Sequence, residues 1–206
     1  MIETTLSLVD YRRRVADIYN RVVEAGADQR SWETWRAART ELLLTHPESP
    51  VIDRGQFEGT LPYFDYDPSW AVLGTVEPLG GDEEPAKLAG GSSLFNQIGS
   101  VVFERAGERH SLGLFWLDAY GGGLLLPFRD KTNGSSTYGA GRYLLDGAKS
   151  ADLGAQGANE LVLDFNFAYH PSCMWDPQWP CPLAPPASHL SVAVEAGEKM
   201  PELTTD

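Results

Sequence analysis

The sequence has no hydrophobic run of the roughly 18 residues that would span a bilayer. Its first residues, MIETTLSLVDYRRR, also lack the basic start and apolar centre of a secretory signal, because the arginines follow a short and mixed stretch. These absences predict a protein that does not enter a membrane and that resides in the cytoplasm. The hydrophobic content of 42% is ordinary for a globular protein.

Basic residues are scarce beyond residue 50. The whole chain carries a formal charge of −13, and residues 51–206 hold 9 basic against 21 acidic side chains. Proteins that bind nucleic acids neutralise the phosphates with lysine and arginine. The sequence therefore argues against a nucleic-acid partner, and it makes the few cations of this part candidates for binding a small anion.

The chain has only two cysteines, Cys173 and Cys181, so it can form at most one intrachain disulfide. Disulfides are rare in a reducing cytoplasm. The predicted location therefore favours free thiols.

Two amphipathic helices are predicted at the start of the chain. Residues 8–25 repeat apolar side chains at steps of three and four behind Ser7, a candidate cap. A second helix is expected to start at Ser31, to bury Trp32, Trp35, Ala38, Leu42 and Leu43, and to stop before Pro47. Together they form a helical hairpin within residues 1–50.

From residue 57 the pattern changes to short apolar or alternating runs separated by Gly, Pro, Asn and Asp, which is typical of strands. Because an open sheet of many short strands tends to curl or close, we expect an antiparallel β-barrel or sandwich. The predicted fold is α+β and mostly β: a single domain, 1–206, with the hairpin (1–50) packed on a β-rich body (51–198) and an acidic tail (199–206). The eight candidate strands are 57–64, 70–78, 93–105, 109–119, 123–130, 142–147, 159–169 and 190–196.

The segment LPFRDKTNGSSTYGAGRYLL combines glycines with Arg129, Lys131 and Arg142. Glycine lets backbone N–H groups approach a ligand, and arginine binds carboxylate or phosphate. The segment therefore predicts an anion site. The alternative is a glycine-rich hairpin whose arginines pair with Asp118, Asp130 or Asp164.

A second polar cluster lies in LVLDFNFAYHPSC. On a strand, Asp164 and Asn166 would share one face, because side chains alternate. If that face lines a barrel, both are candidate ligand-binding residues, since buried polar groups need partners. If it faces water, they are ordinary surface residues.

Both cysteines lie in the proline-rich stretch YHPSCMWDPQWPCPLAPPASHL. His170, Cys173, Cys181 and His189 have the residue types of a zinc site, but only the first pair is closely spaced, so no metal site is predicted. The other interpretations are a Cys173–Cys181 disulfide, a reactive thiolate beside His170, and packing at the end of the sheet.

The two motifs LPFRDKTNGSSTYGAGRYL and LVLDFNFAYHPSCMWDPQWPCPLAPP resemble the bacterial and archaeal domain-of-unknown-function family numbered 1684. The similarity extends from WRAARTELLLTHPESP through PYFDYDPSW to the carboxyl terminus. The resemblance implies no particular activity or cofactor. In relatives the positions of His170 and His189 are commonly asparagine, which weakens the zinc interpretation, and exported members would tolerate a disulfide.

Three functional hypotheses follow. The first is a small anionic ligand bound at one mouth of the barrel, with the ligand-binding residues Arg129, Tyr138, Arg142, Asp164, Asn166 and Tyr169. The second is a thiol-dependent enzyme that uses Cys173 as nucleophile and Cys181 as its resolving partner. The third is a non-catalytic structural or interaction protein in which Arg142 and Asp164 form a buried pair.

Overall fold

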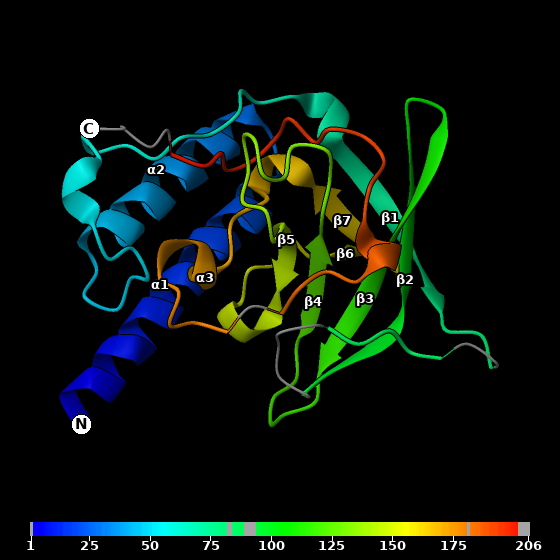
Figure 1. Ribbon diagram of the computed structural model, residues 1–206, viewed down its shortest axis with the longest axis horizontal. Helices are drawn as coiled ribbons and strands as arrows, with labels where there is room; N and C mark the ends of the chain where they lie inside the picture. Colours follow the sequence, from blue (N-terminus) through cyan, green and yellow to red (C-terminus); the bar gives the residue numbers. More distant parts are fainter. Residues whose placement is uncertain (1, 82–83, 89–93, 181, 202–206) are drawn as a thin grey trace.

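The computed structural model describes residues 2–81, 84–88, 94–180 and 182–201. Two helices come first in the chain, and strands and short helical turns follow (Figure 1). The helices are α1 (Ile2–Ala25), α2 (Gln29–Thr45) and the single turn α3 (Ser172–Trp175). The strands are β1 (Ala71–Pro78), β2 (Phe95–Arg105), β3 (Glu108–Leu117), β4 (Leu124–Phe128), β5 (Arg142–Asp146), β6 (Ala155–Gln156) and β7 (Glu160–Asp164). Within this part of the chain, no helix is both long enough and apolar enough to cross a membrane.

The predicted helical hairpin is confirmed. α1 buries Tyr11, Val15 and Tyr19, which are four residues apart and therefore share one face. The helix is longer than predicted and begins at Ile2, so Ser7 lies within it and is not its cap.

The cap of α2 is Asp28, three residues before the predicted start. Its carboxylate accepts a hydrogen bond from the backbone N–H of Ser31, and the Ser31 hydroxyl accepts one from the backbone N–H of Asp28. This reciprocal arrangement is a capping box that fixes where the helix begins. Trp32, Trp35, Leu42 and Leu43 are buried, as predicted, whereas Ala38 is only half-buried.

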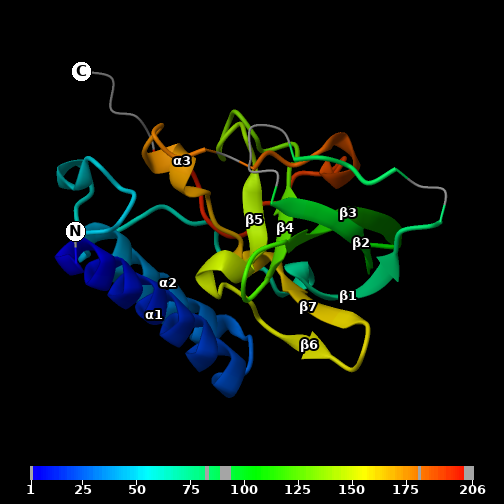
Figure 2. The same cartoon turned by 90° about the horizontal axis from the view of Figure 1, so that it is seen from below.

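The strands form one antiparallel sheet in the order β5-β4-β3-β2-β1-β7-β6. The sheet curls into a half-barrel, and α1 and α2 lie together on one side of it (Figures 1 and 2). The predicted fold class is therefore confirmed, with seven strands where about eight were expected. The hairpin between β2 and β3 turns at Ala106 and Gly107, whose φ values of 53° and 80° suit a tight two-residue turn.

Two predicted strands are absent from the described sheet, and one short strand was missed. Residues 57–64 begin at the end of a 3₁₀ turn and make only an isolated bridge, Tyr63 to Glu198. Residues 190–196 have no regular secondary structure and bond to loops and to an arginine side chain instead of a neighbouring strand. The missed strand, β6, is only two residues long.

The core has two main parts, one on each side of the sheet. One part lies inside the curled sheet and includes Phe103, Phe128 and Phe165. The other lies between the sheet and the helices and includes Trp35 and Phe167. Residues Phe165–Phe167 form a 3₁₀ turn, η4, and not the predicted continuation of β7. The turn sends one phenylalanine into each part of the core.

Gly197 is expected to be intolerant of a side chain. Its φ is +80°, and an added Cβ would overlap the carbonyl oxygens of Ala168 and Phe165. We expect Gly197→Ala to lower the free energy of unfolding by about 2 kcal/mol. Gly26→Ala is the matched control, because Gly26 has φ +87° with open space around it, and the backbone penalty alone is about 1 kcal/mol. Denaturant titration measures both, and equal losses would contradict the role of the clash.

Candidate functional site

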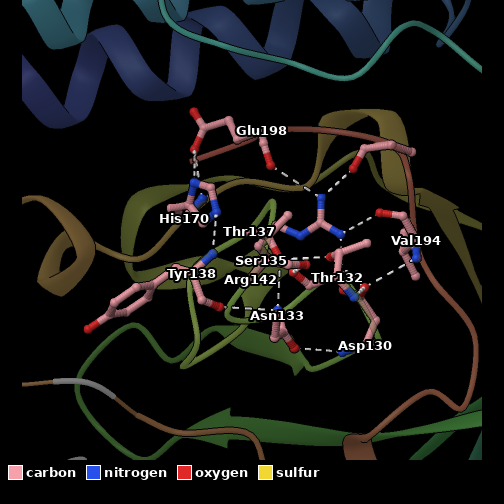
Figure 3. A network of polar contacts seen from close by, with 11 residues as sticks. Asp130, Thr132, Asn133, Ser135, Thr137, Tyr138, Arg142, His170, Val194 and Glu198 are labelled. Atoms are coloured by element: carbon pink, nitrogen blue, oxygen red, sulfur yellow. Dashed lines mark hydrogen bonds and ion pairs between the residues drawn. The ribbon is translucent and has the colours of Figure 1, made fainter. Parts of the chain in front are cut away.

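Arg142 has no exposed surface, as is also true of Asp164 and Asn166 among the predicted ligand-binding residues. Its Nη2 donates to Asp130 Oδ2 at 3.0 Å and to the Val194 carbonyl at 2.7 Å, and its Nη1 donates to the carbonyls of Ala196 and Glu198 (Figure 3). Burial acts to lower the pKa of Arg142, and the carboxylate of Asp130 opposes that shift. Since arginine titrates far above neutral pH, the guanidinium stays charged.

Arg142 therefore pairs with Asp130, one of the partners considered for a glycine-rich hairpin, and not with Asp164. Asp130 in turn organises the loop: its Oδ1 accepts from the backbone N–H and hydroxyl of Thr132 at 2.7 and 2.6 Å. The backbone N–H of Val194 also donates to this oxygen, at 3.2 Å. The Arg142–Asp130 pair thus ties the glycine-rich loop to segment 190–196.

Glu198 continues this network toward the helices. Its carboxylate accepts from Arg39 Nε at 2.6 Å and from the backbone N–H of His170 at 2.7 Å. His170 Nε2 accepts the backbone N–H of Tyr138 at 3.2 Å (Figure 3). Burial and the positive charges of Arg142 and Arg39 hold the pKa of His170 well below its ordinary value, so the imidazole is neutral.

Asp164 and Asn166 form a separate buried pair at η4. Asp164 Oδ1 accepts from the backbone N–H and the side-chain amide of Asn166, at 2.9 and 2.8 Å. The Asn166 side-chain amide also donates a hydrogen bond to the backbone carbonyl of Asp67 and accepts one from its backbone N–H. Burial raises the pKa of Asp164 to about 6. Its Oδ2 has no hydrogen-bond partner among the described residues.

Tyr169 belongs to a third cluster, beside the helices. Its hydroxyl donates to Asp146 Oδ2 at 3.0 Å, and Lys149 Nζ donates to the same oxygen at 2.9 Å. Burial, with the neighbouring Asp146 carboxylate, raises the pKa of Tyr169 well above its ordinary value, so the phenol remains a donor. The Tyr143 hydroxyl donates to the Pro182 carbonyl at 3.0 Å.

The remaining two predicted residues lie apart. Arg129 is half-buried, and its backbone bonds Ser188 and Leu190. The Tyr138 side chain points away from the Arg142 network (Figure 3). The six residues predicted to form one ligand site are therefore distributed over separate clusters.

Cys173 is disulfide-bonded, and Cys181, the other cysteine of the sequence, lies outside the described residues. The preference for free thiols is therefore wrong for Cys173. That preference was based on a cytoplasmic location, and disulfides persist mainly in oxidising compartments. The location itself stays a prediction.

A bonded sulfur has no thiolate with which to attack a substrate. The thiol-enzyme hypothesis therefore requires a reduced form of the protein. The four candidate zinc ligands are likewise not seen as a group: His170 contacts Glu198, His189 Nε2 lies 3.2 Å from the Ala184 carbonyl oxygen, and Cys181 is not described. Among the described residues, no three His, Cys, Asp or Glu side chains are placed to hold a metal ion.

A cavity of about 360 Å³ lies between α1, the sheet and the proline-rich segment, and we call it the helix–sheet cavity. Its wall is mainly apolar. Two cations line it, Arg12 from α1 and Lys149 from the 3₁₀ turn η3 (Gly147–Lys149), and these two elements are in contact. The other lining residues are Leu8, Tyr11, Glu48, Pro50, Phe95, Leu125, Tyr143, Asp146, Ala148, Pro171, Ser172, Trp179, Pro180 and Pro182.

Sequence reasoning missed Arg12, Lys149, Asp146 and Tyr143 as site residues. Arg12 was considered only as one of the arginines that follow the mixed stretch at the start of the chain. The one available signal for the others was the run RYLLDGAK, in which a strand with polar ends leads into a glycine turn carrying a lysine. Nothing in the spacing of these residues indicates that α1 packs over them.

Comparisons with known proteins agree with the resemblance seen in the motifs. Residues 55–199 match the model of the family described as "Protein of unknown function (DUF1684)". No curated protein matches the chain. The fold is similar to the solution NMR structure of the uncharacterized protein from gene locus rrnAC0354 of Haloarcula marismortui, with a TM-score of 0.61 and 32% identity over 83% of this chain and 95% of that one. Because the matched region includes the β-rich body and both long motifs, the chain belongs to the DUF1684 family.

Proposed function

We propose that this protein binds a small anionic molecule with an apolar body in the helix–sheet cavity. The observation that carries the proposal is the combination of a mainly apolar wall with two cations, Arg12 and Lys149, on touching elements. A volume of about 360 Å³ is within the range of small-molecule sites. The apolar wall would enclose the body of the ligand, and the cations would bind its carboxylate or phosphate.

The acidic residues that line the cavity are compatible with the binding of an anion. Asp146 already accepts from Lys149 and Tyr169, so much of its charge is offset within the protein. Lys149 has two further ammonium protons, and 30% of its side chain is exposed. Arg12 makes no ion pair with any described residue and so keeps its full donor capacity. Glu48 lies on the segment after α2. The anionic group of the ligand is expected to lie beside Arg12 and Lys149 and not beside Glu48.

This proposal relocates the anion site that the sequence suggested. Both terminal nitrogens of Arg142 donate to protein acceptors, whereas Arg12 and the two remaining ammonium protons of Lys149 are still available. Of the six residues predicted from the sequence, Tyr169 supports the new site indirectly, because it holds the Asp146 carboxylate that positions Lys149.

The test is to titrate the protein with octanoate and, separately, with 1-octanol, using tryptophan fluorescence as the readout. Trp179 lines the cavity and is 46% exposed, so its fluorescence should respond to a bound ligand. We expect octanoate to bind and the alcohol to bind at least about fivefold more weakly, since only the carboxylate can pair with the cations. Arg12→Gln and Lys149→Gln should each weaken octanoate binding by about three- to tenfold. Arg13→Gln is the matched control, an exposed neighbour that does not line the cavity, and it should have no effect.

Equal binding of octanoate and octanol, or equal effects of Arg12→Gln and Arg13→Gln, would contradict the anion site. A thermal melt gives an independent measure, because a ligand of the native state raises the melting temperature by mass action.

A further inference from the structure

A second cavity, distinct from the helix–sheet cavity, lies where the segment after α2 meets α3. Its volume is about 260 Å³, and three aromatic residues line it: Phe57, Tyr138 and Trp175. The rings of Phe57 and Trp175 are 5.9 Å apart and nearly perpendicular, at 75°. The Tyr138 side chain points away from the Arg142 network, while its backbone N–H is bound by His170 (Figure 3). We call this the aromatic cavity.

One charged side chain, Asp53, lies among the described lining residues. It occupies the N-cap position of the 3₁₀ turn η1 (Arg54–Gln56), where an aspartate would normally accept a backbone N–H, yet its side chain makes no such bond. No ion pair joins Asp53 to any other described residue. Its carboxylate is therefore free to face a ligand.

Two cations that are sequence neighbours of lining residues, Arg54 beside Asp53 and Lys199 beside Met200, are directed elsewhere. Arg54 Nε donates to the Val51 carbonyl at 3.0 Å, and the Lys199 ammonium lies 5.5 Å from the centre of the Phe64 ring. Neither lines the aromatic cavity. The cavity thus combines three aromatic rings with one carboxylate that no neighbouring cation neutralises.

We propose that the aromatic cavity binds a small molecule carrying a methylated ammonium group. The faces of aromatic rings attract cations, Trp most strongly, and a ring of aromatic side chains is the usual site for a quaternary ammonium. Methyl groups on nitrogen make apolar contact with the rings, while the charge is satisfied by ring faces and by Asp53. The sulfurs of Met174 and Met200, which also line the cavity, add polarizable contacts.

The experiment compares choline with its neutral isostere 3,3-dimethylbutan-1-ol, in which carbon replaces nitrogen, by isothermal titration calorimetry at low ionic strength. Shape and apolar surface are the same, so only the charge differs. We expect choline to bind at least about tenfold more tightly. Equal affinities, or no binding of choline, would overturn the proposal.

Substitutions of the lining residues test whether choline binds in the aromatic cavity. Trp175→Leu should abolish choline binding, and Asp53→Asn, at an exposed position that a folded protein tolerates, should weaken it about two- to fivefold. Glu58→Gln is the matched control, because it removes one nearby exposed negative charge outside the aromatic cavity and should leave the affinity unchanged. Choline affinity that is the same in Asp53→Asn and Glu58→Gln would exclude Asp53 as a contact and overturn the assignment. Lys149→Gln should not change choline binding, so this result is independent of the helix–sheet cavity.

Discussion

Arg142→Ala is expected to lower the free energy of unfolding by about 3–5 kcal/mol, the usual cost of removing one partner from a buried ion pair. The substitution leaves the Asp130 carboxylate buried without its cation, and it frees three backbone carbonyls that Arg142 now binds. Arg142→Lys should recover little, because an ammonium cannot reproduce the planar guanidinium that reaches all four acceptors.

Denaturant titration measures the loss. The matched control is Arg109→Ala, whose ion pair with Glu77 is more than half exposed and should contribute less than about 1 kcal/mol. If Arg142→Ala cost no more than Arg109→Ala, the buried network could not be the element that holds segment 190–196 in place.

Asp164→Asn is expected to change how stability depends on pH. The pKa of Asp164 rises from 3.8 to about 6 on folding, so the native state favours the protonated carboxyl. Its contribution is therefore fully present below pH 3.8 and is lost as the pH rises through about 6. The gap of about two pKa units corresponds to about 3 kcal/mol.

Asparagine keeps the acceptor for Asn166 and cannot ionise. Relative to the unmodified protein, the variant should therefore gain about 3 kcal/mol of stability between pH 4 and pH 7, as measured by denaturant titration across that interval. Asp118→Asn, at an exposed position, should show no such trend. Parallel pH profiles for Asp164→Asn and the unmodified protein would contradict the raised pKa.

The helices and most of the sheet were predictable because local periodicity determines them. Tyr11, Val15 and Tyr19 repeat at helical spacing, and the alternating runs around Ala106 and Gly107 indicate a hairpin without reference to the rest of the chain. The failures occurred where side chains replace backbone partners. Asp164 caps a 3₁₀ turn and ends β7, and Arg142 takes carbonyls of segment 190–196 that would otherwise bond to a strand.

The candidate sites were less predictable for a different reason. Arg142 was predicted to bind a ligand anion, but it pairs with Asp130 of the same motif. The two residues lie at the two ends of one loop. The helix–sheet cavity depends on α1 packing near η3, and the aromatic cavity depends on Phe57, Tyr138 and Trp175 converging from three segments. Such long-range convergence leaves no spacing pattern in a single sequence.

The ion pair between Arg39 and Glu198 joins residues 159 positions apart, and both are buried. During synthesis the helical hairpin emerges before residue 198, and Arg39 lacks its Glu198 partner until that residue has left the ribosome. A buried cation without its partner is strongly unfavourable. Docking of α2 against the sheet is thereby delayed until residue 198 has emerged, so the helical hairpin and the β-rich body are expected to fold as one cooperative unit and not helix by helix.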